Sequence, residues 1–117
     1  MSVSVTSEIG RLQRVLVHTP GPELLAVTPD TRVDFLYDDI INIDDAQREH
    51  RRFVAILERF ATVLHVRELL RDVLDDPAAR ELFIRETMDV TAAHPLARQL
   101  AELPTDDLVR RVIEGHE

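Results

Sequence analysis

The chain of 117 residues carries 44% hydrophobic and 31% charged side chains, a composition typical of one globular domain rather than of a disordered segment. Its formal net charge of −8 argues against a nucleic-acid partner, because phosphate binding needs clustered lysine and arginine. The sequence contains no cysteine, which excludes disulfides, thiolate metal sites and a cysteine nucleophile from these 117 residues.

The N-terminus, MSVSVTSEIG, lacks the charged start and apolar middle of a signal peptide. No apolar run approaches the ~18 residues that a membrane-spanning helix needs. We therefore expect a cytoplasmic protein with no membrane partner.

The first half of the sequence has the pattern of an α/β unit. A β-branched run, Val15 to His18, ends in a Thr-Pro-Gly turn and predicts a buried strand. A helix follows, with Asp44 as its expected N-cap and Gln47 completing a capping box. A second β-rich run, residues 62–66, should pair in parallel with the first strand because a helix connects them. The helix stripe expected to face the strands is Ala46, His50, Phe53, Val54, Leu57 and Phe60.

From Arg67 onward the sequence predicts several short helices, which together indicate a small helical bundle. Asp76 and Pro77 give a cap followed by proline at the first helical position, and Gly115 is the expected stop of the last helix. The side chains expected to face inward are Val66, Leu69, Leu70, Val73 and Leu74, then Leu82, Phe83 and Val90, then Leu96 and Leu100, and finally Leu108, Val112 and Ile113.

The five histidines do not form a recognisable metal motif. No pair has the i, i+4 spacing of a helical zinc site, and no thiolate is present to help. His50 lies on the apolar stripe of its helix, which favours a hydrogen-bonded core histidine over a ligand, and His65, within a strand, has the same interpretation. We therefore expect no metal and no other cofactor.

Most of the adjacent acid pairs are explained as helix starts, where carboxylates meet the positive end of the helix dipole. The pair Asp38–Asp39, in the run FLYDDIIN, has no such capping role. Neighbouring side chains on an extended chain point to opposite sides, so at most one of the two acids should face a binding site. A polar surface turn and a site for a cationic ligand both fit this pair.

The runs SEIGRLQRVLVHTPGPEL, VTPD, FLYDDI and AQREHRRF resemble, in order and spacing, the N-terminus of bacterial arginine deiminases. The resemblance covers essentially the whole chain. Two details depart from the family pattern: Ala26 and Val27 precede the Thr-Pro where an Asn-Leu pair is common, and Tyr37 stands where phenylalanine is usual.

The resemblance implies an α/β (α+β) fold in the guanidine-modifying superfamily. Residues 1–66 would form the first ββαβ-type module of a pentein propeller, and residues 67–117 the helical segment that the family inserts after it. The intact family hydrolyses L-arginine to citrulline and ammonia with a cysteine nucleophile, a histidine acid/base and carboxylates that bind the guanidinium. By this resemblance FLYDDI lines the substrate pocket, which gives Leu36, Asp38 and Asp39 as candidate substrate-binding residues.

The family's catalytic cysteine, its histidine and its guanidinium-binding carboxylates come from later modules, so we expect no catalysis by this chain alone. Three interpretations remain open: a truncated piece of a full enzyme, a natural fragment that dimerises or completes a partner, and an independent module that binds guanidinium compounds. A non-catalytic acidic interaction protein is a further alternative. A single module leaves strand edges and a sheet face uncovered, which favours a homo-oligomer. Arginine or another guanidinium compound is the expected ligand once further modules complete the site.

Overall fold

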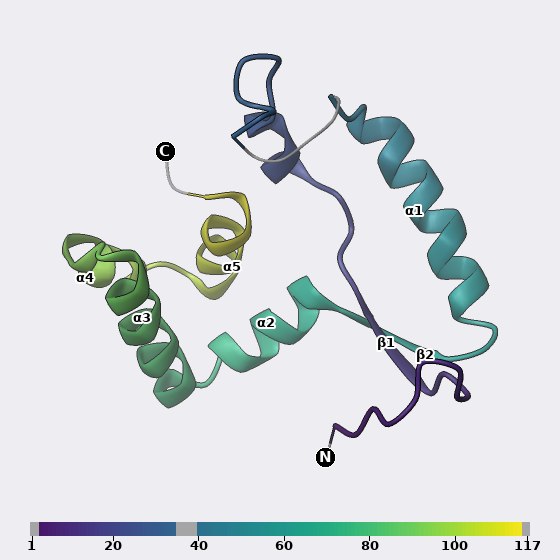
Figure 1. The fold of residues 1–117 in the computed structure, drawn as a ribbon. Coiled ribbons are helices and arrows are strands. Elements are labelled where there is room, and N and C mark those ends of the chain that lie inside the picture. Colours follow the sequence, from purple (N-terminus) through teal and green to yellow (C-terminus); the bar gives the residue numbers. More distant parts are fainter. Residues whose placement is uncertain (1–2, 35–39, 116–117) are drawn as a thin grey trace.

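The computed structural model describes residues 3–34 and 40–115 and combines helices with a small parallel sheet (Figure 1). The first part contains strand β1 (Arg14–Val17), a 3₁₀ turn η1 (Pro22–Ala26), helix α1 (Ile43–Leu57) and strand β2 (Thr62–His65). The second part contains α2 (Val66–Leu74), α3 (Pro77–Thr91), η2 (His94–Leu96), α4 (Ala97–Ala101) and α5 (Thr105–Glu114). The mixed α and β character expected from the sequence is confirmed, and no described helix is long and apolar enough to cross a membrane.

The two strands pair in parallel, as their helical connection predicts. Val15 lies opposite Val63, and Val17 opposite His65. Since side chains alternate along a strand, these four residues share one face of the sheet, and Leu16 and Leu64 share the other. Val17 is buried, whereas Leu16 is 58% exposed. One face of the sheet is therefore covered and the other is largely open.

The N-cap of helix α1 lies two residues before the expected one. The side chain of Asn42 accepts a hydrogen bond from the backbone N–H of Asp45 at 3.2 Å, so Asn42 is the cap and Asp44 lies in the first turn. Gln47 does not complete a capping box, because its side chain donates to the carbonyl oxygen of Pro20 at 2.9 Å. This bond ties α1 to the loop that follows β1.

The expected burial of Phe53 against the strands is wrong. Phe53 is 56% exposed and Phe60 is 70% exposed, whereas Val54 is buried. Residues of α1 with reduced exposure follow a stripe through Ile43, Ala46, Gln47, His50, Val54 and Leu57. Phe53 belongs to a second apolar stripe beside this one, and helical periodicity alone does not separate two adjoining stripes.

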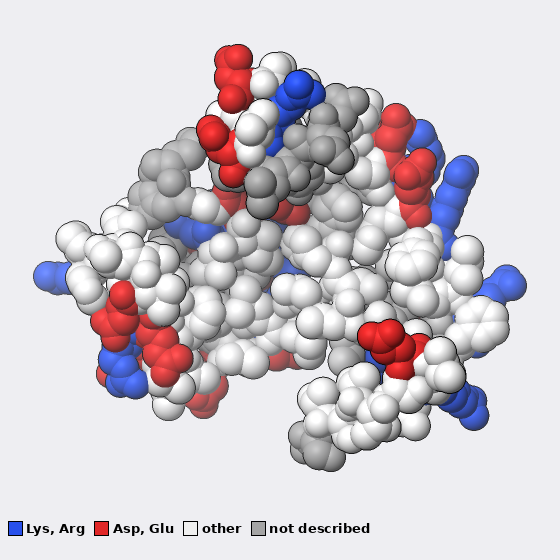
Figure 2. Space-filling view, viewed as in Figure 1, with Lys and Arg blue, Asp and Glu red and all other residues white. Residues whose placement is uncertain are grey.

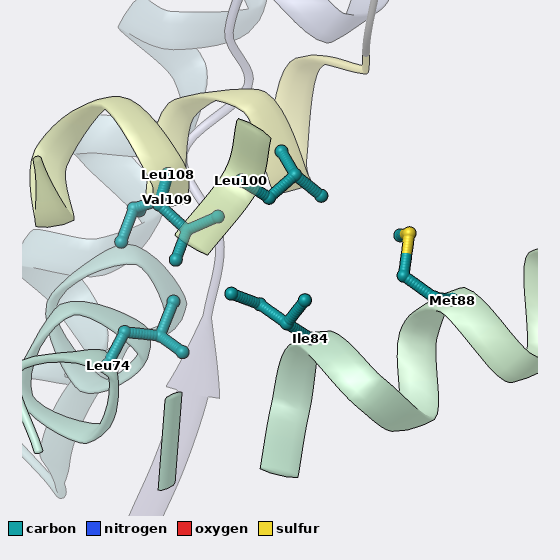
Figure 3. Packing of buried hydrophobic residues seen from close by; sticks show 6 residues of the cluster. All are labelled: Leu74, Ile84, Met88, Leu100, Leu108 and Val109. Atoms are coloured by element: carbon teal, nitrogen blue, oxygen red, sulfur yellow. The ribbon is translucent and has the colours of Figure 1, made fainter. Parts of the chain in front are cut away.

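The second part has its own apolar core, built where α2, α3, α4 and α5 meet (Figure 3). Leu74 and Leu108 are almost completely buried at its centre. The other buried members are Ile84, Met88, Leu100 and Val109. Leu82 and Val90 were expected to face inward but are 44% and 87% exposed, because α3 turns Ile84 and Met88 towards the core instead. Leu69, Val73 and Val112 are likewise more exposed than expected.

Polar interactions hold this bundle at its edges. Asp76 caps α3 by accepting from the backbone N–H of Ala79 at 2.8 Å, as the sequence predicts. The Arg80 guanidinium donates to the carbonyl oxygens of Leu100, Ala101 and Leu103, which lie at the end of α4 and just after it. Gly115 ends α5 with a φ of 91°, a left-handed conformation that favours glycine.

The molecule exposes more surface than a compact domain of its mass. Its solvent-accessible area is 9255 Å², whereas a folded monomer of this mass exposes roughly 6,500 Å². Its radius of gyration is 16.9 Å, against about 13 Å for a compact chain of this length. In Figure 1, α1 lies on one side of the strands and α2–α5 lie on the other. The arrangement leaves apolar side chains available for further contacts.

Candidate functional site

Two histidines lie at the carboxyl end of the sheet, where parallel strands commonly present binding groups. His18 directly follows β1, and His65 is the last residue of β2. Because Val17 pairs with His65 in register, both strands end at the same edge. A hollow of about 150 Å³ opens there, lined by His18, Thr19, His65, Val66, Arg67 and Glu68.

Glu23 is held against His18 by the tight turn between them. Its Oε1 lies 2.8 Å from Nε2 of His18 and accepts from the backbone N–H of Gly21 at 2.9 Å. Burial alone would raise the pKa of Glu23, but the hydrogen bonds from His18 and from the backbone N–H groups of Glu23 and Gly21 outweigh it and lower the pKa. Glu23 is therefore a carboxylate at neutral pH, and its buried Oε2 has no hydrogen-bond partner among the described residues.

His50 of α1 faces the same corner of the molecule. Burial lowers its pKa below the ordinary value, and the positive charges that His65 and His18 acquire on protonation lower it further. The expectation that His50 is hydrogen-bonded is wrong for one ring nitrogen, since its buried Nε2 has no partner in the described part of the chain. This part of the molecule thus combines the neutral imidazole of His50, the His18–Glu23 pair and the unpartnered Oε2 of Glu23.

This arrangement can share a proton between His18 and Glu23, whereas Glu23 does not line the hollow. Within residues 3–34 and 40–115, no three histidine or acidic side chains lie close enough together to hold a metal ion. A larger and more open hollow of about 420 Å³, lined in part by Arg11, Leu12 and Phe60, lies at the opposite end of the strands.

The candidate substrate-binding residues Leu36, Asp38 and Asp39 lie outside the described residues. The chain on either side of them is placed: η1 precedes them, and α1 begins at Ile43. Sequence reasoning missed Glu23 and its partner His18. The signal was present in the HTPGPEL run, because a Pro-Gly turn brings residues five apart back together.

Comparison with known proteins identifies the family to which this chain belongs. The family model described as arginine deiminase matches residues 34–109, which include both α1 and most of the helical bundle. The chain belongs to the arginine deiminase family. It is 33% identical over 121 residues to the arginine deiminase of Lactococcus lactis subsp. cremoris, an alignment that covers 97% of this chain and 30% of that protein.

A second relative, the arginine deiminase of Streptococcus pneumoniae strain Hungary19A-6, is 40% identical over 88 residues. That alignment covers 74% of this chain and 22% of the relative. The chain therefore spans less than a third of the length of either arginine deiminase. The family model also includes the FLYDDI run, so the candidate residues fall within the part of the chain that carries the family likeness.

Proposed function

We propose that this chain forms the first pentein-type module and the inserted helical segment of an arginine deiminase. In that role it contributes to a site that hydrolyses L-arginine to citrulline and ammonia. The single observation that carries the proposal is the arginine deiminase match across residues 34–109, which joins the α/β part to the helical part. The relative from Lactococcus lactis supports it, because 97% of the chain aligns with that protein.

The exposed surface supports the same proposal. The chain exposes 9255 Å², roughly 2,800 Å² more than a compact monomer of its mass. Leu16 on the open face of the sheet is 58% exposed, although it lies in a strand. Further modules placed beside this sheet would cover that face and pair the free strand edges. The arginine deiminases that this chain resembles are more than three times its length, and their additional length would provide those modules.

The catalytic chemistry needs groups that these residues do not include. Hydrolysis of a guanidinium through a covalent intermediate requires a strong nucleophile at the central carbon, and a thiolate is such a nucleophile. The sequence has no cysteine. This chain's share of the work is therefore binding and positioning of arginine, and the nucleophile comes from the remaining modules.

Leu36, Asp38 and Asp39 are the proposed contacts to arginine. An apolar side chain packs against the aliphatic part of the substrate, and a carboxylate accepts hydrogen bonds from the planar cation. Since adjacent side chains on an extended segment point to opposite sides, only one of the two aspartates would meet the substrate.

A segment exchange tests the proposal. In the Lactococcus lactis arginine deiminase, the segment aligned with this chain would be replaced by this chain, and citrulline formation from arginine would be measured. We expect the chimera to form citrulline and the isolated 117-residue chain to form none. A control chimera carrying Val90→Ser, a change at a side chain that is 87% exposed on α3, should retain the activity. A folded chimera without citrulline formation would overturn the proposal.

A further inference from the structure

The outer side of helix α1 carries apolar side chains that the described chain leaves largely exposed. Phe53 and Ile56 are 56% and 57% exposed, and Phe60, in the turn after the helix, is 70% exposed. Their spacing of three and four residues places these three side chains, the α1 patch, on one side of the helix. Helix α1 lies at the edge of the molecule, on the far side of the strands from α2–α5 (Figure 1), so the α1 patch is open to a partner.

Two arginines flank the α1 patch. Arg52 lies four residues before Ile56 and Arg59 three residues after it, so both are neighbours of Ile56 on the helix surface. Both are exposed, and neither side chain takes part in an ion pair within the described part of the chain. Arg48, one turn before Arg52, differs because Asp45 pairs with it. In Figure 2, basic side chains project from the outer side of α1 around uncharged surface near its end.

The nearest carboxylates do not neutralise these two arginines. Glu58 is two residues from Ile56, and positions two apart on a helix do not face each other. Glu49 lies one turn before Phe53 and marks the N-terminal boundary of the α1 patch. The last turns of α1 therefore present an apolar surface with unpaired positive charge along one flank.

The α1 patch ends at a hollow in the surface. Phe60, Arg11 and Leu12 contribute to the lining of the hollow of about 420 Å³ at the amino end of the strands, and Glu58 is also among its lining residues. Leu12 is itself 45% exposed. The hollow gives a bulky side chain of a partner a place to pack beside Phe60.

We propose that the α1 patch docks an amphipathic helix of another protein that carries carboxylates beside its apolar stripe. Such a helix repeats its apolar side chains at intervals of three and four residues, which matches the spacing of Phe53, Ile56 and Phe60. Carboxylates accept paired hydrogen bonds from a planar guanidinium, so they would bind Arg52 and Arg59. Since these arginines are seven residues apart, carboxylates seven residues apart on the partner match them.

The charge of the whole chain favours this partner over other anionic ones. Its formal net charge is −8, and a nucleic acid or an anionic bilayer presents continuous negative charge that would repel most of the molecule. An acidic helix presents its carboxylates along one flank only. A second copy of this chain fits poorly, because it would bring the same two arginines, Arg52 and Arg59, to the contact.

Fluorescence anisotropy with a labelled 18-residue helical peptide tests the proposal on the full chain. The peptide carries leucines at intervals of three and four residues, with glutamates on both flanks of the leucine stripe. We expect saturable binding with a dissociation constant on the order of 10–100 μM, because the patch is smaller than the ~800 Å² per partner of a standard interface. The same peptide with glutamine in place of every glutamate should bind at least ~10-fold more weakly.

Variants of the chain locate the binding surface. Arg52→Glu/Arg59→Glu and Phe53→Ser/Ile56→Ser should each weaken binding at least ~10-fold, with unchanged far-UV circular dichroism because all four side chains are exposed. Matched controls lie on α3, which also carries exposed apolar and basic side chains. Binding should be unchanged in Leu82→Ser/Val90→Ser and in Arg85→Glu.

The measurement needs no citrulline formation, so its result is independent of the proposed enzymatic role. Equal binding of the glutamate and glutamine peptides would overturn the proposal, as would binding that survives the α1 variants. Binding to phosphatidylglycerol vesicles that the α1 variants abolish, without binding of the peptide, would assign the patch to a membrane instead. Self-association that Phe53→Ser/Ile56→Ser abolishes would assign it to a second copy. A folded segment-exchange chimera that no longer binds the peptide would show that the enzyme's other modules cover α1.

Discussion

Replacing Leu108 by alanine should remove about 3–4 kcal/mol from the free energy of unfolding. Leu108 is fully buried at the centre of the helical core, where its neighbours come from other helices (Figure 3). The change deletes three carbon atoms, worth about 2.4 kcal/mol at ~0.8 kcal/mol per buried carbon. A residual cavity of ~50 Å³ adds about 1.2 kcal/mol, because helices pinned from several sides close only partly around it.

The matched control is Val112→Ala on the same helix. Val112 is 36% exposed, so its truncation should cost only about 1 kcal/mol or less. Urea unfolding followed by circular dichroism gives both values by linear extrapolation, with every protein at the same concentration because self-association shifts apparent stability. A loss below about 1.5 kcal/mol for Leu108→Ala, or one equal to that of Val112→Ala, would refute the account of the core.

Four further outcomes follow from individual contacts. Arg80→Met should cost about 2–3 kcal/mol in unfolding free energy, since it removes the donor to the carbonyls that end α4; an unchanged urea midpoint would contradict this. Asp76→Ala should cost about 1 kcal/mol through loss of the α3 cap, and Asp76→Asn should recover most of it. The folded-state pKa of His50 lies below 6.5, so the unfolded chain binds the proton more tightly and stability should fall as the pH drops below about 6.5; His50→Gln should flatten that slope in urea titrations. The pKa of Glu23 is lowered from 4.5, so its contribution should be lost in a separate window as the pH falls below that value, and Glu23→Gln should remove the loss.

The strands and their parallel pairing could be predicted from the sequence because β-branched runs bounded by turns, with a helix between them, leave few alternatives. The start of α3 was equally predictable, since Asp76 and Pro77 combine a capping side chain with a fixed backbone angle. The first residue of α1 was less predictable from the sequence. Asn42 and Asp44 are both good caps, and local sequence does not decide between them; in the structure Asn42 is the cap and Gln47 binds Pro20 instead of completing a capping box.

The exposure of Phe53 could not be predicted, because an apolar residue on a helix can pack in the chain's own core or lie on its surface. The sequence pattern shows that Phe53 lies on an apolar stripe of the helix. It does not show whether another part of the chain packs against that stripe. The His18–Glu23 pair is a similar case, since its geometry depends on the path of the loop after β1. Local patterns predict elements well, whereas the partner of each apolar or polar face depends on the assembled structure.

The most direct test of the proposed role measures the KM for arginine in the segment-exchange chimera with Asp38→Asn and with Asp39→Asn. If this chain lines the arginine site, one of the two variants should raise the KM at least ~10-fold, because loss of a charge-assisted hydrogen bond costs about 1.5–3 kcal/mol. The other variant should leave it near the parent value. An unchanged KM in both variants would contradict the proposal that these residues bind arginine.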